Sequence, residues 1–224
     1  MASFDAAAPL GSFSRTNART HRAIVARRVW PIVSRAALVS LFLLFASANY
    51  SDWRVTGTPS GLGATLLEGW VAVLFLVRRS TNQFSRRPLA WVAAVIGSCA
   101  MMLARPGGSG LPHLPCEIVQ LLGVLIALVS LAALGRSFGL VAADRGLKTR
   151  GPYRLVRHPA YAGYLVCYGA YVAENPSARN SALLLLSTVF QLVRINEEER
   201  VLAADSSYAS YRRNVKRRLI PRVY

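Results

Sequence analysis

Two short polar segments in the C-terminal part of the chain carry the side chains best suited to chemistry. The first is RHPAY at 157–161, where His158 directly precedes Pro159 at the start of an apolar stretch. Proline is favoured in the first turn of a helix, so His158 is expected at a helix N-terminus. The free N–H groups of that turn attract a carboxylate, and Tyr153 and Tyr161 add hydrogen-bonding and stacking surfaces. A plain helix start explains the same pattern.

The second segment is RINEEER at 194–200, which follows the last apolar stretch. Arg194 and Glu198 are four residues apart, so they share one face of a continuing helix. A solvated ion pair at a helix end is the simpler explanation, and such pairs contribute little stability. However, three consecutive acids stand here where the neighbouring loops are basic. A bound cationic ligand would explain them.

The elements that must position these segments are apolar stretches almost free of charge. There are six, and each comes close to the length of about 20 residues that a perpendicular membrane-spanning helix needs. The two C-terminal ones are the shortest. The stretches are 36–51, 62–77, 88–104, 118–135, 159–173 and 180–193.

The basic residues are distributed unevenly between the segments that join these stretches. Of the 27 Lys and Arg residues, 23 fall before the first span, in alternate loops or after the last span, three fall in the other loops, and Arg35 is counted with the first span. Cytoplasmic loops of membrane proteins carry such an excess. The pattern therefore predicts an all-α, multi-pass membrane protein with about six (five to seven) transmembrane helices and both termini cytoplasmic.

Composition excludes several other classes of protein. A chain with 53% apolar residues is too hydrophobic for intrinsic disorder. The net charge of +17 is accounted for by membrane topology, so no nucleic-acid partner is expected. The three cysteines, Cys99, Cys116 and Cys167, have neither the number nor the spacing for a disulfide framework or a zinc site. No metal is therefore predicted.

Three regions follow from these patterns. Residues 1–28 are expected to form a basic cytoplasmic arm near anionic headgroups, although a transit peptide has a similar composition. Residues 29–134 would form the N-terminal transmembrane helices, the first of them an uncleaved anchor. Residues 135–224 would hold the catalytic region if the protein is an enzyme, with a long polar loop, two short helices and a cytoplasmic tail.

The order of motifs in this last region resembles a known family. GRSFG at 135–139, GPYRLVRHPAYAGY at 151–164, NPS at 175–177, RINEEERVL at 194–202 and YASYRRNVKRRLIP at 208–221 are similar to the isoprenylcysteine carboxyl methyltransferase and phospholipid methyltransferase family. Their order and spacing make the combination specific, and it covers about residues 130–224. Nothing comparable is found in 1–129.

The resemblance implies an integral-membrane enzyme that uses S-adenosyl-L-methionine at the cytoplasmic face. It implies that Arg194 and Glu198 are catalytic and that Arg194 binds the methyl acceptor. The family pair of acids is matched to Glu198 and Glu199. The residues that the resemblance assigns to the cofactor are Leu147, Lys148, Tyr153, His158, Pro159, Ala160, Tyr161, Glu198 and Glu199.

The expected function is methyl transfer to a lipophilic or prenylated acceptor, with isoprenylcysteine-type carboxyl O-methylation first. A carboxylate acceptor is already ionised and needs no base, whereas an amine or hydroxyl would need Glu197, Glu199 or His158. Phospholipid N-methylation is the alternative within the family. A membrane reductase that uses a nicotinamide cofactor, and a non-enzymatic scaffold or transporter, are the alternatives outside it. The expected location is the cytoplasmic membrane of a prokaryote or the endoplasmic reticulum of a eukaryote.

Overall fold

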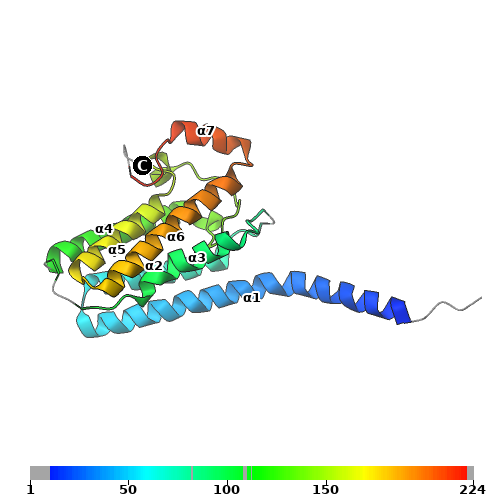
Figure 1. The fold of residues 1–224 in the computed structure, drawn as a ribbon, viewed down its shortest axis with the longest axis horizontal. Helices are drawn as coiled ribbons and strands as arrows, with labels where there is room; N and C mark the ends of the chain where they lie inside the picture. Colours follow the sequence, from blue (N-terminus) through cyan, green and yellow to red (C-terminus); the bar gives the residue numbers. More distant parts are fainter. Residues whose placement is uncertain (1–10, 82, 108–109, 112, 221–224) are drawn as a thin grey trace, which may run out of the picture. The chain divides into compact units, whose positions relative to one another are not determined.

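The chain is mainly helical in the residues that the structure describes. The computed structural model describes the backbone of residues 11–81, 83–107, 110–111 and 113–220, with side chains from residue 32 onward. Within these ranges Phe84 and Ala143 form an isolated bridge, and no strand is present. The all-α prediction is therefore confirmed. The helices are α1 (Gly11–Thr56), α2 (Pro59–Val77), α3 (Pro88–Cys99), η1 (Ala100–Leu103), α4 (His113–Leu134), η2 (Gly135–Ser137), η3 (Gly151–Arg154), α5 (Pro159–Glu174), α6 (Ala178–Leu202) and α7 (Ser206–Asn214) (Figure 1).

The chain divides into two compact units at Leu38. The first unit contains the N-terminal part of α1. Residues 1–10 of the predicted basic arm lie outside the described residues, and from Gly11 onward the arm is helical. The second unit begins at Val39 and contains every later helix, so the cavity described below belongs to it.

Three segments are long and apolar enough to cross a membrane. They are Ile32–Thr56, Pro59–Val77 and His113–Ser137, and Pro88–Leu103 is a shorter apolar segment. Large apolar side chains on α2 and α4, such as Leu66, Leu122 and Leu125, are more than half exposed, as lipid-facing side chains would be. The protein is therefore a membrane protein by the length and character of its helices.

The predicted count of about six spans goes beyond these three segments. α3 has 12 residues and α5 has 16, which at 1.5 Å per residue rise about 18 and 24 Å. A hydrocarbon core of about 30 Å is thicker than either helix. α6 has 25 residues, but its C-terminal third carries the charged motif. These three helices also contribute the side chains of the candidate site.

Close contact between α4 and α5 fixes the centre of the helical bundle. These helices pack along each other more extensively than any other pair among the described residues. A Cβ at Gly123 would stand 2.7 Å from the backbone oxygen of Gly163, and one at Gly163 would stand 2.7 Å from the oxygen of Gly123. The two backbones therefore touch, as at small-residue contacts between membrane helices. α3 packs against α6 in the same bundle.

Candidate functional site

A cavity of about 210 Å³ opens between the helices of the second unit. Its polar end is formed by the start of α5, the C-terminal half of α6 and the loop between η2 and η3. Its apolar end is formed by α2, α3 and α4. The residues that carry the argument below are Glu68, Leu147, Lys148, Tyr153, His158, Ala160, Tyr161, Tyr164, Gln191, Arg194 and Glu198.

His158 stands at the N-cap of α5, where the sequence placed it, and Pro159 occupies the first turn. The backbone N–H of His158 donates to the carbonyl of Arg218 at 2.8 Å, and that of Arg157 donates to Arg217 at 2.9 Å. The C-terminal tail therefore runs alongside the start of α5 and holds it. The His158 ring is buried and borders the cavity, with its centroid 5.7 Å from that of Tyr161.

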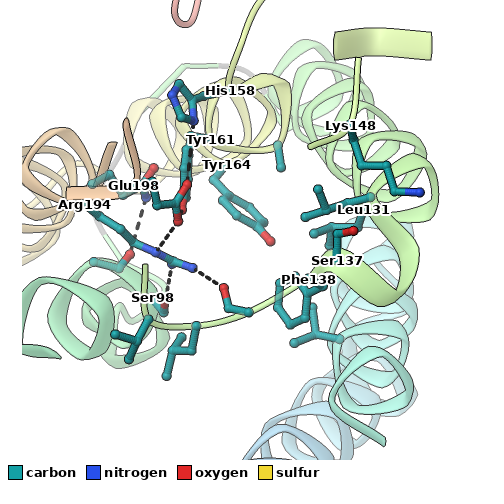
Figure 2. Close-up of a pocket in the computed structure, with 18 of the residues that line it drawn as sticks. Ser98, Leu131, Ser137, Phe138, Lys148, His158, Tyr161, Tyr164, Arg194 and Glu198 are labelled. Carbon is teal, nitrogen blue, oxygen red and sulfur yellow. Dashed lines mark hydrogen bonds and ion pairs between the residues drawn. The ribbon is translucent and has the colours of Figure 1, made fainter. Parts of the chain in front are cut away.

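Glu198 and Arg194 form an ion pair on one face of α6. Nε of Arg194 lies 3.3 Å from Oε1 of Glu198, as the i,i+4 spacing predicted. The Tyr161 hydroxyl donates to the same Glu198 oxygen, and Nδ1 of His158 lies 3.7 Å from Oε2. Figure 2 shows Tyr164 projecting into the cavity between Glu198 on one side and Phe138 on the other. The Glu198 side chain is 22% exposed, so a ligand can reach its carboxylate.

Arg194 is held in place by contacts from two distant parts of the chain. Its Nη1 donates to the Ser98 hydroxyl at 2.9 Å, and its Nη2 donates to the Gly139 carbonyl at 3.0 Å. Its guanidinium carbon lies 5.1 Å from the centre of the Tyr161 ring, close enough for a cation–π contact. These contacts fix the guanidinium at the cavity wall. Nothing in the local sequence around Ser98 marks it as a partner of Arg194.

The guanidinium of Arg145 packs directly against Gly139. A Cβ at this position would stand 2.3 Å from Nη1 of Arg145, so the arginine side chain lies where any larger residue would be. Burial, followed by the charge of Arg78, lowers the pKa of Arg145 to about 10, which leaves it cationic at neutral pH. Gly139 is the last residue of the GRSFG motif, so this motif marked the position in the sequence.

Glu199 faces a different environment from its neighbour. It accepts from Nε of Arg157 at 2.9 Å and from Nη2 of Arg218 at 2.8 Å, and Nε2 of His158 lies 3.2 Å away. Burial raises the pKa of this carboxyl, but the hydrogen bonds from His158 and Arg157 outweigh burial and hold the pKa at about 2. Glu199 is therefore an anion with three basic partners, and it does not line the cavity.

Glu197 points to a third environment. Its Oε1 accepts from Arg87 at 2.8 Å and from Arg200 at 2.7 Å. Arg87 is the N-cap of α3, so this ion pair joins the start of α3 to α6. Of the three consecutive acids, Glu198 is the one that lines the cavity.

The other predicted cofactor residues divide into two groups. Leu147, Lys148, Tyr153, Ala160 and Tyr161 line the cavity, whereas Pro159 is buried and does not line it.

Tyr208 and Tyr211 of α7 complete the polar end of the cavity. The Tyr211 hydroxyl donates to the backbone carbonyl of Tyr153 at 2.7 Å, so α7 is tied to η3. Burial raises the pKa of Tyr153, which keeps its hydroxyl protonated at neutral pH.

These side chains suit a ligand that carries both signs of charge and an aromatic ring. Glu198 offers an exposed carboxylate for a cation, and Lys148 and Arg145 offer cationic groups for a carboxylate. Tyr153 and Tyr211 offer ring surfaces for stacking. S-Adenosylmethionine carries cations, a carboxylate and an aromatic base, so the residues of the cavity fit this cofactor.

A second polar cluster lies at the start of α4. A nitrogen of His113 and carboxylate oxygens of Glu117 and Glu174 lie within 4.8 Å of one another, close enough to hold a metal ion. The sequence had predicted no metal site. Glu117 accepts from the Ser60 hydroxyl at 2.9 Å, and Glu174 accepts from Gln120 at 2.7 Å and contacts His113. These bonds join α2, α4 and α5.

Comparison with known proteins supports a membrane methyltransferase. Residues 116–208 match the phospholipid methyltransferase family, which confirms the resemblance to the integral-membrane methyltransferases. The matched segment contains η3, α5 and α6 and therefore most of the polar end of the cavity. No curated protein matches the chain.

Proposed function

Because the family match indicates a membrane methyltransferase, we propose that this protein transfers a methyl group from S-adenosyl-L-methionine to a lipophilic acceptor. The observation that carries the proposal is the position of Glu198. Its carboxylate is accessible at the cavity, whereas the flanking Glu197 and Glu199 are both paired with arginines outside it. An accessible acid in a protein of net charge +17 suits a cationic methyl donor.

In this proposal the polar end of the cavity binds the cofactor. Glu198 holds a positively charged part of it, and Tyr161 orients the Glu198 carboxylate through the hydroxyl hydrogen bond. His158 borders the site at the start of α5, where helix N–H groups favour a carboxylate. Leu147 and Lys148 close the side formed by the loop.

The chemistry requires alignment and exclusion of water. S-Adenosylmethionine supplies a methyl group on a sulfonium, which is open to in-line displacement. The chain must then hold the acceptor atom in line with that methyl group, since correct placement lowers the barrier to reaction. Arg194 is fixed by Ser98 and Gly139 beside Glu198, so it can orient an acceptor group next to the donor. The apolar walls from α2 and α4 exclude water.

For the acceptor we propose the carboxylate of an isoprenylcysteine-type molecule, with phospholipid N-methylation as the second candidate. Arg194 supports the first, because a guanidinium can orient a carboxylate and no base is then required. The name of the matched family supports the second. An amine would need a base, and among the candidates from the sequence His158 lines the cavity, whereas Glu197 and Glu199 do not.

The proposed location is a cytoplasmic or endoplasmic reticulum membrane, with the polar end of the cavity at the cytoplasmic face. The basic residues around that end support this orientation, since Arg145, Lys148, Arg157 and Arg218 all surround it. The acceptor tail would enter from the bilayer, and membrane lipids would be its immediate neighbours.

Calorimetric titration of S-adenosylmethionine into the detergent-purified protein tests the cofactor site. His158→Ala and Glu198→Ala should each abolish binding while the protein still inserts. Glu117→Gln, which removes a buried acid outside the cavity, serves as the control and should bind normally. Unchanged affinity in both cavity variants would refute the assignment.

Labelled S-adenosylmethionine incubated with the protein and host lipids tests the transfer. Base-labile label would indicate a methyl ester, and base-stable label an N-methyl or O-alkyl product. Arg194→Ala should bind the cofactor and fail to transfer. If no label is incorporated, and a prenylcysteine analogue is also inert, the protein is not this enzyme.

A further inference from the structure

Glu68 is an acid in the middle of the apolar helix α2. It stands nine residues before Val77, the last residue of the helix, in a segment long and apolar enough to cross a membrane. A carboxylate at such depth is costly unless it meets a partner or a cavity, and it marks a functional position by default. Glu68 meets both, since it lines the cavity and accepts from Nδ2 of Asn49 at 2.8 Å.

Glu68 uses only a small part of its hydrogen-bonding capacity in the contact with Asn49. Asn49 is a neutral amide, and among the described residues no lysine, arginine or histidine forms an ion pair with Glu68. A carboxylate can accept about four hydrogen bonds. Asn49 therefore fixes one oxygen, and the remaining lone pairs are available to a molecule in the cavity.

Gln191 offers a second acceptor at the wall of the same cavity. Its side chain is 1% exposed, and Nε2 donates to the Ser187 hydroxyl at 3.1 Å and the Gly97 carbonyl at 3.4 Å. Because a carbonyl can only accept, the contact with Gly97 fixes the orientation of the amide. Oε1 is then left buried without a hydrogen-bond partner among the described residues. Such an orphaned acceptor is costly unless a donor reaches it.

We propose that Glu68, positioned by Asn49, and Gln191 form a subsite for a hydrogen-bond-donating group of the methyl acceptor, a hydroxyl or an ammonium. Both side chains carry acceptors, and both residues line the cavity that also contains Arg194. The subsite suits a donor group that stands beside a reacting carboxylate held by Arg194, or one that first loses a proton to a base and then receives the methyl group on the lone pair so exposed. Asn49 and Glu68 precede the matched family segment, which begins at residue 116.

This inference rests on the proposed function, and its consequence is selectivity among lipophilic acceptors. A plain hydrocarbon chain that bears neither hydroxyl nor amine would leave Glu68 and Gln191 unsatisfied. A site built to bind a polar group discriminates strongly against an analogue that lacks it, for the same reason. Glu68 is therefore a specificity-determining residue in this assignment.

Matched single-chain probes test the subsite without any methyl transfer. Hexadecylamine, hexadecanol and methyl palmitate are titrated against the detergent-purified protein, and their affinities are compared. The unaltered protein should bind the amine or the alcohol at least about tenfold more tightly than the ester, the usual scale for a hydrogen bond to a charged group. Glu68→Leu should abolish that preference. Glu68→Gln should abolish it for the amine, because the charge is lost.

Two controls keep the outcome decisive. Glu117→Gln removes a buried acid outside the cavity and should keep the full preference. S-Adenosylmethionine affinity within about twofold of the unaltered protein shows that each Glu68 variant is folded. If Glu68→Leu does not fold, the isosteric Glu68→Gln decides through the amine. Tighter binding of the ester, or a preference that survives in Glu68→Gln for the amine, overturns the subsite. Failure of the unaltered protein to bind S-adenosylmethionine would instead overturn the proposed function.

Discussion

Glu198 and Glu199 are neighbours in the chain and have opposite environments. Glu199 is enclosed by Arg157, Arg218 and His158, and its side chain is 8% exposed. Glu198 is 22% exposed and has Arg194 and the Tyr161 hydroxyl beside it. Successive helical residues are about 100° apart, so one turn of α6 presents one acid to the tail and the other to the cavity.

The two environments indicate two roles, in which Glu199 stabilises the fold and Glu198 is placed to bind a ligand. The ion pairs of Glu199 join α6 to the start of α5 and to the C-terminal tail, and we call the group of Arg157, Glu199 and Arg218 the tail clasp. Glu198 faces the cavity with part of its hydrogen-bonding capacity available. Substitutions at the two positions should therefore affect different measurements.

Breaking the tail clasp should have the largest effect on stability. Glu199→Ala leaves the buried Arg157 without its carboxylate, and removing one partner of a buried ion pair costs about 3–5 kcal/mol of unfolding free energy. Denaturation of the detergent-solubilised protein measures it. Asp205→Asn, which changes a half-exposed N-cap acid of α7, should cost far less. Equal losses in the two variants would mean that the clasp contributes no special stability.

Glu198→Gln should have the converse effect. The amide keeps the shape of the side chain but loses its charge, so affinity for S-adenosylmethionine should fall at least about tenfold, or about 1.4 kcal/mol. Unfolding free energy should fall less than in Glu199→Ala, because Glu198 is partly exposed and the amide oxygen of Gln can still accept from Tyr161. Calorimetry and denaturation on one preparation give both values. A variant that loses stability but keeps its cofactor affinity would reverse the division between the two acids.

Tyr211→Phe removes the hydroxyl that ties α7 to η3 and should cost about 1 kcal/mol of unfolding free energy. The expected local effect is faster amide hydrogen exchange in residues 151–156. Since the phenyl ring remains at the cavity, cofactor affinity should fall only a few-fold. Exchange rates that stay the same in 151–156 would show that the tail does not restrain this loop.

The tail clasp should also make the stability of the protein depend on pH. Since the pKa of Glu199 is about 2 in the folded protein and 4.5 is its usual value, the folded state binds fewer protons between these values. The stability that this carboxylate contributes is therefore complete above about pH 5 and is lost as the pH falls toward 2. The difference in unfolding free energy between the unaltered protein and Glu199→Gln should shrink on acidification. A difference that grows instead would contradict the assigned charge state.

Local sequence patterns predicted the parts of the site that depend on one helix. Proline in the first turn placed His158 at the N-cap of α5, and i,i+4 spacing placed Arg194 beside Glu198. Spacing alone could not separate the roles of Glu198 and Glu199, because their partners lie on other elements. Arg218 belongs to the tail, and Arg157 precedes α5.

Contacts between distant segments were beyond the reach of the sequence. Ser98 and Gly139 meet Arg194 because α3 and the loop after η2 both pack against α6, and no local periodicity encodes such a meeting. Likewise, the sequence shows that Glu68 stands in an apolar stretch but not that Asn49 holds it beside the cavity. That α3 and α5 are spans stays a prediction, because both helices are shorter than the hydrocarbon core is thick.

The contact between Gly123 and Gly163 has a consequence for conformational entropy. It locks α4 to α5, and the loop that carries Leu147, Lys148 and Tyr153 runs from the end of one helix to the start of the other. The two ends of that loop therefore have a fixed separation before any ligand arrives. The entropy of closing the loop, which grows with the logarithm of its length, is lost during folding of the bundle and not during binding. A ligand then has to order only the side chains, so the contact between these two glycines lowers the entropic cost of binding at the polar end of the cavity.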